Sequence, residues 1–467
     1  MAASTFSGSF FIFISFEATL IGRCKCLVFW NWRINIVKHF FQFAQRQTSY
    51  KQETMAGITT FLSMAYILVV NPIILSQSGM DKGAVFTATA ISAIIGSLLI
   101  GLLANFPIGI APSMGLNSFF TFSVCIGMGI PWQTTLTGVF IAGILFILLS
   151  LFKIREMIIN IIPEDLKYAI SGGLGFFVAF VGLKNAGFII SNKDTVVSLG
   201  DLSKTTTILA IIGLVITVIM MVRRIGGAIF YGMVITTIIG IVCHVIDKPT
   251  HIVGKIPSLT PTFGVVFKHL DQIFSPDVLA VIFTFLFVAF FDTAGALIAI
   301  ASQAGLIKDN KIPNIGRALL ADSTSIVVGS VLGTSTTASM VESSAGIAAG
   351  GRTGFTSVII SCGFFIALFF SPLLSIVTSE VTAPALIIVG ALMASEIKQI
   401  NWNRIEIVFP AFVTIIMMPL TSSVATGIAL GFILYPVTMI ALGKWKAVHP
   451  LIYILSLAFL AYFVFIV

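Results

Sequence analysis

Apolar segments of nearly constant length follow one another along the chain from residue 54 to its end. Each is close to the roughly 20 residues that an α-helix needs to cross the hydrocarbon core of a bilayer. Only 9% of the residues are charged, and the mean hydropathy is +1.08. A soluble globule of 467 residues could not cover its surface with so few charges. We therefore expect an all-α polytopic membrane protein.

The segments predict about fourteen membrane spans. We place them at residues 55–76, 85–104, 107–125, 131–151, 165–190, 205–222, 226–246, 276–301, 315–332, 335–350, 354–377, 381–396, 405–420 and 423–441. A further apolar stretch at 448–467 is either a fifteenth span or part of a different division of the last three. With the amino terminus in the cytoplasm, every arginine after residue 53 falls in a cytoplasmic loop, as the positive-inside rule requires.

Several function classes are disfavoured by the distribution of charge and cysteine. The net charge of +8 sits in the loops and in the first 53 residues, so it indicates membrane orientation and not nucleic-acid binding. The five cysteines show no zinc-binding spacing, and the chain has no His-Glu-x-x-His motif. We expect no cofactor and no enzymatic activity. Residues 1–38 are expected to be an atypical amino-terminal extension, because their apolar stretch is too short to span and contains Glu17.

Two groups of spans repeat one another. The segment Thr60–Tyr66 parallels 284–290, and 92–99 parallels 325–332, with Ser76-Gln77 matching Ser302-Gln303 between them. The repeat is seven spans long, and an odd number places the second copy upside down in the membrane. Inverted repeats are typical of secondary transporters, which bind substrate near the midplane where the repeats meet. We divide the chain into a first repeat at 39–247, an external linker at 248–275 and a second repeat at 276–467.

Spans 3 and 10 are predicted to be broken helices. Residues 107–117 and 333–351 are rich in Gly, Ser, Thr or Pro and too polar to face lipid. Irregular backbone at membrane depth is tolerated only where it is buried or lines a cavity. The substrate site is therefore expected at these two corresponding segments.

Three acids after residue 53 lie well inside predicted spans, namely Asp292, Asp322 and Glu342, and no Lys or Arg accompanies them. Carboxylates in hydrocarbon are costly, so they normally face a cavity and take part in function. Asp292 and Glu342 at mid-span favour proton exchange, and sodium held by the same oxygens is the alternative. Asp322 lies nearer the start of its span, where it could equally tie helices together. Asn117, in broken span 3, is a further candidate.

The motifs resemble those of the nucleobase:cation symporters of the second type, in the branch of hypoxanthine/guanine/adenine permeases. The residues that carry this resemblance are Ala56–Pro72, Gly115–Phe120, Phe291–Gly295, Gly333–Thr337 and Glu342–Gly354. It extends from about residue 39 to 467. It implies fourteen spans in two inverted repeats of seven, with spans 1–4 and 8–11 forming a core domain and spans 5–7 and 12–14 a gate domain. Spans 3 and 10 would be half-helices preceded by short strands, with the base between them.

The resemblance also implies roles for single residues. Asp292 takes the place of the span-8 acid, Glu342 that of the span-10 acid that holds the N–H edge of the base, and Asn117 that of the span-3 asparagine of purine permeases. The full predicted site adds the neighbours Gly115, Val341, Thr334 and Ser343. Asp292, Glu342 and Asp322 are the candidates for proton coupling.

We therefore expect a plasma-membrane transporter (in the inner membrane if bacterial) that imports purine nucleobases by proton symport, through an elevator-like movement of the core domain. Hypoxanthine and guanine are favoured, and adenine stays open. Its expected partners are the purine and the bilayer, without nucleic acid, and a homodimer stays open. The alternatives are an anion transporter or exchanger on the same inverted-repeat fold, and a channel.

Overall fold

The computed structural model describes residues 37–467 apart from 153–162, 193–195, 249–250, 252, 271–274, 276–277, 280, 287–288, 291–292, 294–296, 298–313, 341, 376–377, 422–423 and 466–467. The chain divides into two compact units, Met1–Lys51 and Gln52–Val467. In the first unit, the ring of Phe43 packs edge-on against that of Tyr50, with centroids 4.9 Å apart. The predicted extension, residues 1–38, lies outside the described residues except at 37 and 38. The second unit carries the membrane-type helices and the candidate site.

The described residues up to 242 form the first set of helices and strands. Their bounds are α2 (Tyr50–Met64), α3 (Ile67–Ser76), α4 (Lys82–Leu99) with the π-helical turn η1 (Ile100–Ala104), β1 (Ile110–Pro112), α5 (Met114–Ser118) with η2 (Phe119–Gly127), α6 (Trp132–Leu151), α8 (Glu164–Asn185), β2 (Ile189–Asn192), β3 (Val196–Leu199), α9 (Thr205–Val222) and α10 (Ala228–Val242).

The second part repeats this organisation of long helices with one broken segment. Its elements are the short helix η3 (Val265–Lys268), α12 (Ile315–Leu332), β4 (Thr337–Ser339), α13 (Ser343–Ala348), α14 (Gly354–Ala367) with η5 (Leu368–Ser375), α15 (Ser379–Ala394) with η6 (Ser395–Gln399), α16 (Ile405–Leu420), α17 (Val424–Ala441), η7 (Trp445–Ala447) and α18 (Pro450–Phe465).

Eight helices in the described part of the chain are long and apolar enough to cross a membrane, and shorter apolar helices accompany them. Their outer faces are apolar as well: Val215, Val218 and Val222 of α9 are all largely exposed. Such a surface is stable in lipid but not in water. The protein is therefore a mostly helical, multi-pass membrane protein, and the count of fourteen spans stays a prediction.

The predicted spans 205–222, 315–332 and 405–420 coincide with α9, α12 and α16. The predicted span 165–190 was wrong at its carboxyl end, because α8 ends at Asn185 and the chain continues into the antiparallel β2–β3 hairpin. Gly187, two residues later, has φ of +75°, a left-handed conformation that ends an α-helix. The predicted span 276–301 lies largely outside the described residues.

Two very short strands join the halves of the second unit. Strand β1 pairs antiparallel with β4, with Ile110 opposite Ser339 and Pro112 opposite Thr337. All six strand residues are buried. Helix α4 supports β1 from behind, because Ser97 Oγ accepts from Ile110 N at 3.0 Å and donates to Ile110 O at 3.2 Å. These bonds satisfy backbone groups that a broken helix leaves without partners.

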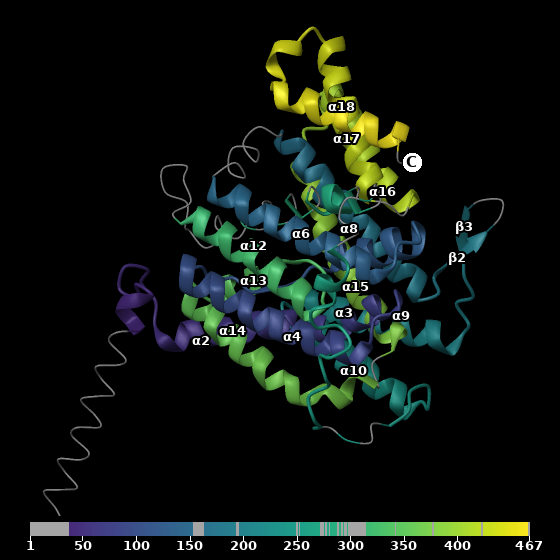
Figure 1. Ribbon diagram of the computed structural model, residues 1–467. Coiled ribbons are helices and arrows are strands. Elements are labelled where there is room, and N and C mark those ends of the chain that lie inside the picture. The colour runs from purple at the N-terminus through teal and green to yellow at the C-terminus, as the bar shows by residue number, and fades with distance from the viewer. Residues whose placement is uncertain are drawn as a thin grey trace, which may run out of the picture. The chain divides into compact units, whose positions relative to one another are not determined.

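Helices from the two halves interleave around this pair of strands. Figure 1 shows α4 between α12 and α14, two helices that come more than 200 residues later, and α4 packs against both. The described part of the predicted linker 248–275 also contacts α12. Gly264 N donates to Val331 O at 2.8 Å, and Thr262 Oγ1 donates to Leu332 O at 3.1 Å. Of the segments that the sequence relates by an internal repeat, 92–99 in α4 and 325–332 in α12 thus belong to helices that pack against each other.

Candidate functional site

The two broken segments cross at the β1–β4 pair, and each strand leads into a short helix. Beyond the ladder, Ser113 N donates to Thr336 O and Met340 N donates to Gly109 O, both at 2.9 Å. Because the strands are antiparallel, α5 and α13 leave the crossing in opposite directions. Asn117 lies in α5, and Glu342 immediately precedes α13. The tertiary structure therefore brings the two segments that the sequence predicted to be broken into direct contact.

Glu342 has a neutral partner from span 1. The phenol of Tyr66 donates to Oε1 of Glu342 at 2.6 Å, and Tyr66 is fully buried at the junction of α2 and α3. Among the described residues, Lys and Arg side chains form ion pairs with Glu406 and not with Glu342. Within the described part of the chain, the carboxyl group is thus oriented by a hydrogen bond and not paired with a cation.

Asn117 belongs to a buried amide network that reaches four segments. Its Nδ2 donates to Oδ1 of Asn71 in α3. The Nδ2 of Asn71 in turn donates to Oγ1 of Thr89 in α4 at 2.8 Å and to Oγ1 of Thr334, just before β4, at 3.0 Å. All four side chains belong to residues with no exposed surface. Two predicted site residues from opposite halves, Asn117 and Thr334, are therefore held together by Asn71.

The other predicted site residues hold the segments in place. Ser343 Oγ accepts from Gly109 N at 3.0 Å and so ties the start of α13 to the chain before β1. Gly115 lets α5 approach α8, since a Cβ there would lie 2.8 Å from the side chain of Leu174. Asp322 is fully buried in α12. Asp292 and Val341 lie outside the described residues, so the pairing of Asp292 with Glu342 stays a prediction.

The phenylalanines near the site pack against one another. The rings of Phe119 and Phe120 lie 5.2 and 6.2 Å from that of Phe285. Phe119 and Phe120 are also almost fully buried, so they are part of the packed core.

Sequence reasoning missed Tyr66, Asn71 and Thr89. Tyr66 and Asn71 fall inside the motif Ala56–Pro72, which indicates the family but not the roles of these two residues. Asn71 directly precedes Pro72 within an apolar helix. A buried amide beside a proline could have marked Asn71 as a candidate. Proline leaves a helix carbonyl without its usual partner, and polar side chains buried in a membrane need hydrogen-bond partners. Nothing local to Tyr66 or Thr89 indicates which residue it contacts.

Helix α2 contacts the region of span 10 at a second point, through Glu53. This fully buried carboxylate accepts from Arg352 N at 2.9 Å, Thr353 N at 3.2 Å and the Thr356 hydroxyl at 2.6 Å. It thereby satisfies donors at the start of α14. From the sequence, Glu53 counts only among the charges of the first 53 residues, so its role was missed.

Between these two points, α13 lies directly on α2. A Cβ at Gly346 would overlap Oγ1 of Thr60 and lie 2.6 Å from the carbonyl of Ala56. Glu53, Ala56 and Thr60 are spaced as one face of a helix. This face, together with Tyr66, supports the segment that presents Glu342.

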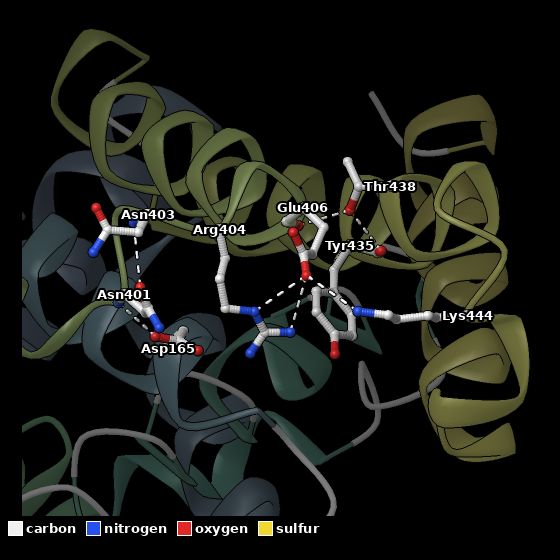
Figure 2. Close-up of polar contacts among 8 residues, drawn as sticks. All are labelled: Asp165, Asn401, Asn403, Arg404, Glu406, Tyr435, Thr438 and Lys444. Carbon is white, nitrogen blue, oxygen red and sulfur yellow. Dashed lines mark hydrogen bonds and ion pairs between the residues drawn. The ribbon is translucent and has the colours of Figure 1, made fainter.

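A second polar cluster joins α8, α16 and α17 (Figure 2). Arg404 donates through Nε and Nη2 to Oε1 of Glu406, both at 3.1 Å, and Lys444 Nζ lies 3.9 Å from the same oxygen. Asn401 N donates to Oδ1 of Asp165 at 2.8 Å. The side chains of Arg404 and Lys444 are 45% and 56% exposed, so these ion pairs contribute little to stability. We assign this cluster no part in substrate binding.

Residues 51–430 match the permease family. The guanine/hypoxanthine permease PbuG of Bacillus subtilis is 55% identical over 439 residues, which are 92% of this chain and 100% of that protein. The adenine permease AdeQ of Escherichia coli is 40% identical over 426 residues, or 91% and 95% of the two chains. The transmembrane domain of the cyanobacterial bicarbonate transporter BicA is similar with a TM-score of 0.63 at 16% identity, covering 82% of this chain and 97% of that one. This last likeness concerns the fold alone.

Proposed function

Because the chain belongs to the permease family, and within it to the nucleobase:cation symporters of the second type, we propose that it carries purine nucleobases across a membrane. The resemblance drawn from the sequence motifs is thus confirmed. The family consists of transporters, so the chain is a transporter and not an enzyme.

The identity of 55% with a guanine/hypoxanthine permease over that protein's entire length carries the proposal. Hypoxanthine and guanine are the substrates that it favours. A relative named as an adenine permease is 40% identical, so adenine is the next candidate.

The site geometry supports recognition of a flat, uncharged heterocycle. A purine presents N–H donors at its edges, and the carboxylate of Glu342 is an acceptor held in place by Tyr66. Asn117 stands on the other broken segment and is linked to Thr334 through Asn71. We propose that the base lies between these segments and that Asp292 of span 8 completes the site.

Proton symport is the coupling that we propose. Glu342 is a membrane-embedded carboxyl group without a basic partner among the described residues, and such a group exchanges protons more readily than a paired one. Asp292 and Asp322 are the other candidates, and sodium is the rival ion. The core domain would move past the gate domain, like an elevator, once base and proton are both bound.

The membrane arrangement follows from the same proposal. Spans 1–4 and 8–11 form the core domain, spans 5–7 and 12–14 form the gate domain, and the amino terminus faces the cytoplasm. The plasma membrane is the expected location.

Anion transport is the second reading, since the fold resembles that of a bicarbonate transporter. We do not favour it. Anion sites need positive potential, and Glu342 stands at the crossing without a described Lys or Arg.

Uptake of radiolabelled hypoxanthine by cells that lack their own purine carriers tests the proposal. Competition by guanine, adenine and uracil defines the substrate, and sulfate and bicarbonate serve as anionic competitors. We expect accumulation that guanine inhibits, that anions do not inhibit, and that a protonophore collapses.

Three results would count against parts of this proposal. Absence of purine uptake at normal membrane levels rejects purine transport. Accumulation that withstands a protonophore but needs external sodium rejects the proton. Uptake that only equilibrates across the membrane indicates a channel.

A further inference from the structure

We infer that Asn117 presents its carbonyl oxygen, and not its amino group, to the transported base, and that Thr89 and Asn71 impose this orientation. The inference rests on the proposed function. It adds that the Asn117 side of the site accepts a hydrogen bond from the base and does not donate one. It assigns Thr89 and Asn71 as positioning residues.

The orientation begins at a backbone carbonyl in α4. The hydroxyl of Thr89 donates its single hydrogen to Val85 O, one helical turn earlier, at 2.6 Å. Oγ1 of Thr89 can therefore only accept from any other partner. Its other partner is the side-chain amide of Asn71 at 2.8 Å, which must direct Nδ2 towards it.

The fixed orientation of the Asn71 amide in turn determines which atom of Asn117 faces it. With Nδ2 facing Thr89 and Thr334, its oxygen faces Asn117. An amide oxygen cannot donate, so Asn117 must offer its own Nδ2 to that oxygen. The Oδ1 of Asn117 then lies on the opposite side of its amide, and it has no hydrogen-bond partner in the part of the chain that the structure describes.

Burial makes this arrangement selective. Thr89, Asn71 and Asn117 have no exposed surface, so water does not compete for their hydrogen bonds. Turning the Asn71 amide around would set two oxygens against each other at Thr89 or break its bond to Val85. An acceptor left unpaired in a buried site is costly, so the Asn117 oxygen favours a ligand that brings a donor.

The free purine bases provide such a donor. Each carries an N–H on its five-membered ring, whereas substitution at N9, as in a nucleoside, leaves only an acceptor nitrogen there. Glu342 on the other broken segment is an acceptor as well. The site is thus inferred to select heterocycles with N–H groups at two edges. It would reject N9-substituted purines because their acceptor nitrogen faces the Asn117 oxygen, in addition to their larger size.

The test compares Thr89→Val with Thr89→Ser. Valine keeps the shape of threonine but removes the acceptor that orients Asn71, whereas serine keeps the hydroxyl. For each variant, inhibition of labelled hypoxanthine uptake is measured with unlabelled hypoxanthine and with 9-methylhypoxanthine. The readout is the inhibition constant of 9-methylhypoxanthine divided by that of hypoxanthine. The size of the methyl group affects every variant alike, so a change in this ratio reports on hydrogen bonding.

We expect the ratio to fall by about tenfold in Thr89→Val, the worth of roughly one hydrogen bond, since Asn117 can then turn its amino group towards N7 of the methylated base. In Thr89→Ser the ratio should return to the wild-type value. Asn71→Leu removes the constraint on Asn117 directly and should lower the ratio as well. It tests the inference if Thr89→Val does not reach the membrane.

A wild-type ratio in Thr89→Val and in Asn71→Leu, whatever their uptake rate, overturns the inference, because a merely structural role would slow transport without changing selectivity. Absence of purine uptake by the wild-type chain would instead reject the proposed function. The two failures are therefore distinguishable.

Discussion

The phenol of Tyr66 donates a 2.6 Å hydrogen bond to Oε1 of Glu342, although 276 positions separate the two residues in the chain. Tyr66 lies just after α2, the helix on which α13 rests, and Glu342 immediately precedes α13. The first span thus supports the tenth at the residue that we propose to bind the base. Hydrogen bonds to charged groups are among the stronger ones in proteins, so this contact should matter for affinity.

Tyr66→Phe should raise the KM for hypoxanthine by about tenfold or more, because it removes a charge-assisted hydrogen bond and leaves Glu342 free to rotate. The maximal rate should change less than the KM. Concentration-dependent uptake measures both. Tyr231→Phe, at an exposed tyrosine of α10, is the matched control and should behave as wild type. An unchanged KM in Tyr66→Phe would show that the phenol does not position Glu342.

Glu342→Gln should abolish concentrative purine uptake while the protein still reaches the membrane. Glutamine keeps the size of the side chain but loses both the negative charge and the exchangeable proton. Uptake of labelled hypoxanthine measures the loss of accumulation, and quantification of the protein in the membrane shows that its level is normal. Glu406→Gln, within the ion pairs of Figure 2, is the control and should keep accumulation. Normal accumulation by Glu342→Gln would remove this residue from both binding and coupling.

Glu53→Gln should lower the melting temperature of the purified protein in detergent. The substitution turns one of the two acceptor oxygens into an amino group, which opposes the N–H of either Arg352 or Thr353, a loss of about 1–3 kcal/mol for buried groups. A thermal-shift assay measures it. Glu164→Gln, at an exposed position in the first turn of α8, should leave the melting temperature unchanged. Equal melting temperatures for the two variants would mean that the Glu53 contacts contribute nothing net.

Gly346→Ala should impair transport, because even one methyl group would overlap Thr60 Oγ1 and press on the carbonyl of Ala56. The short helix α13 must then move away from α2 and take Glu342 with it. We expect a rise in KM, measured by uptake, with a smaller loss of thermal stability. Adding a methyl group by Ala348→Val, on the exposed side of the same helix, is the control. If Gly346→Ala transports normally, the close packing of α13 on α2 is not required for the site.

Much of the fold could be predicted from the sequence because the bilayer restricts it so strongly. An uninterrupted apolar stretch must be helical to satisfy its backbone, and the predicted boundaries of 205–222, 315–332 and 405–420 are those of α9, α12 and α16. The glycine- and serine-rich segments at 107–117 and 333–351 could not continue as lipid-facing helices, and they contain the strands β1 and β4. The end of α8 was misplaced, because an apolar stretch does not reveal where a left-handed residue such as Gly187 will end the helix.

The sequence by itself determined that this is a membrane protein and where its long apolar segments lie, and it singled out Glu342 and Asn117 as candidates for the site. These properties depend on the local cost of placing polar groups in hydrocarbon, and a single segment reveals that cost. Only the tertiary structure decided that Tyr66 donates to Glu342, that Asn71 joins Asn117 to Thr89, and that Glu53 accepts from the start of α14. A hydrogen bond between distant spans depends on how helices pack, and many polar residues in a chain could satisfy the same donor or acceptor.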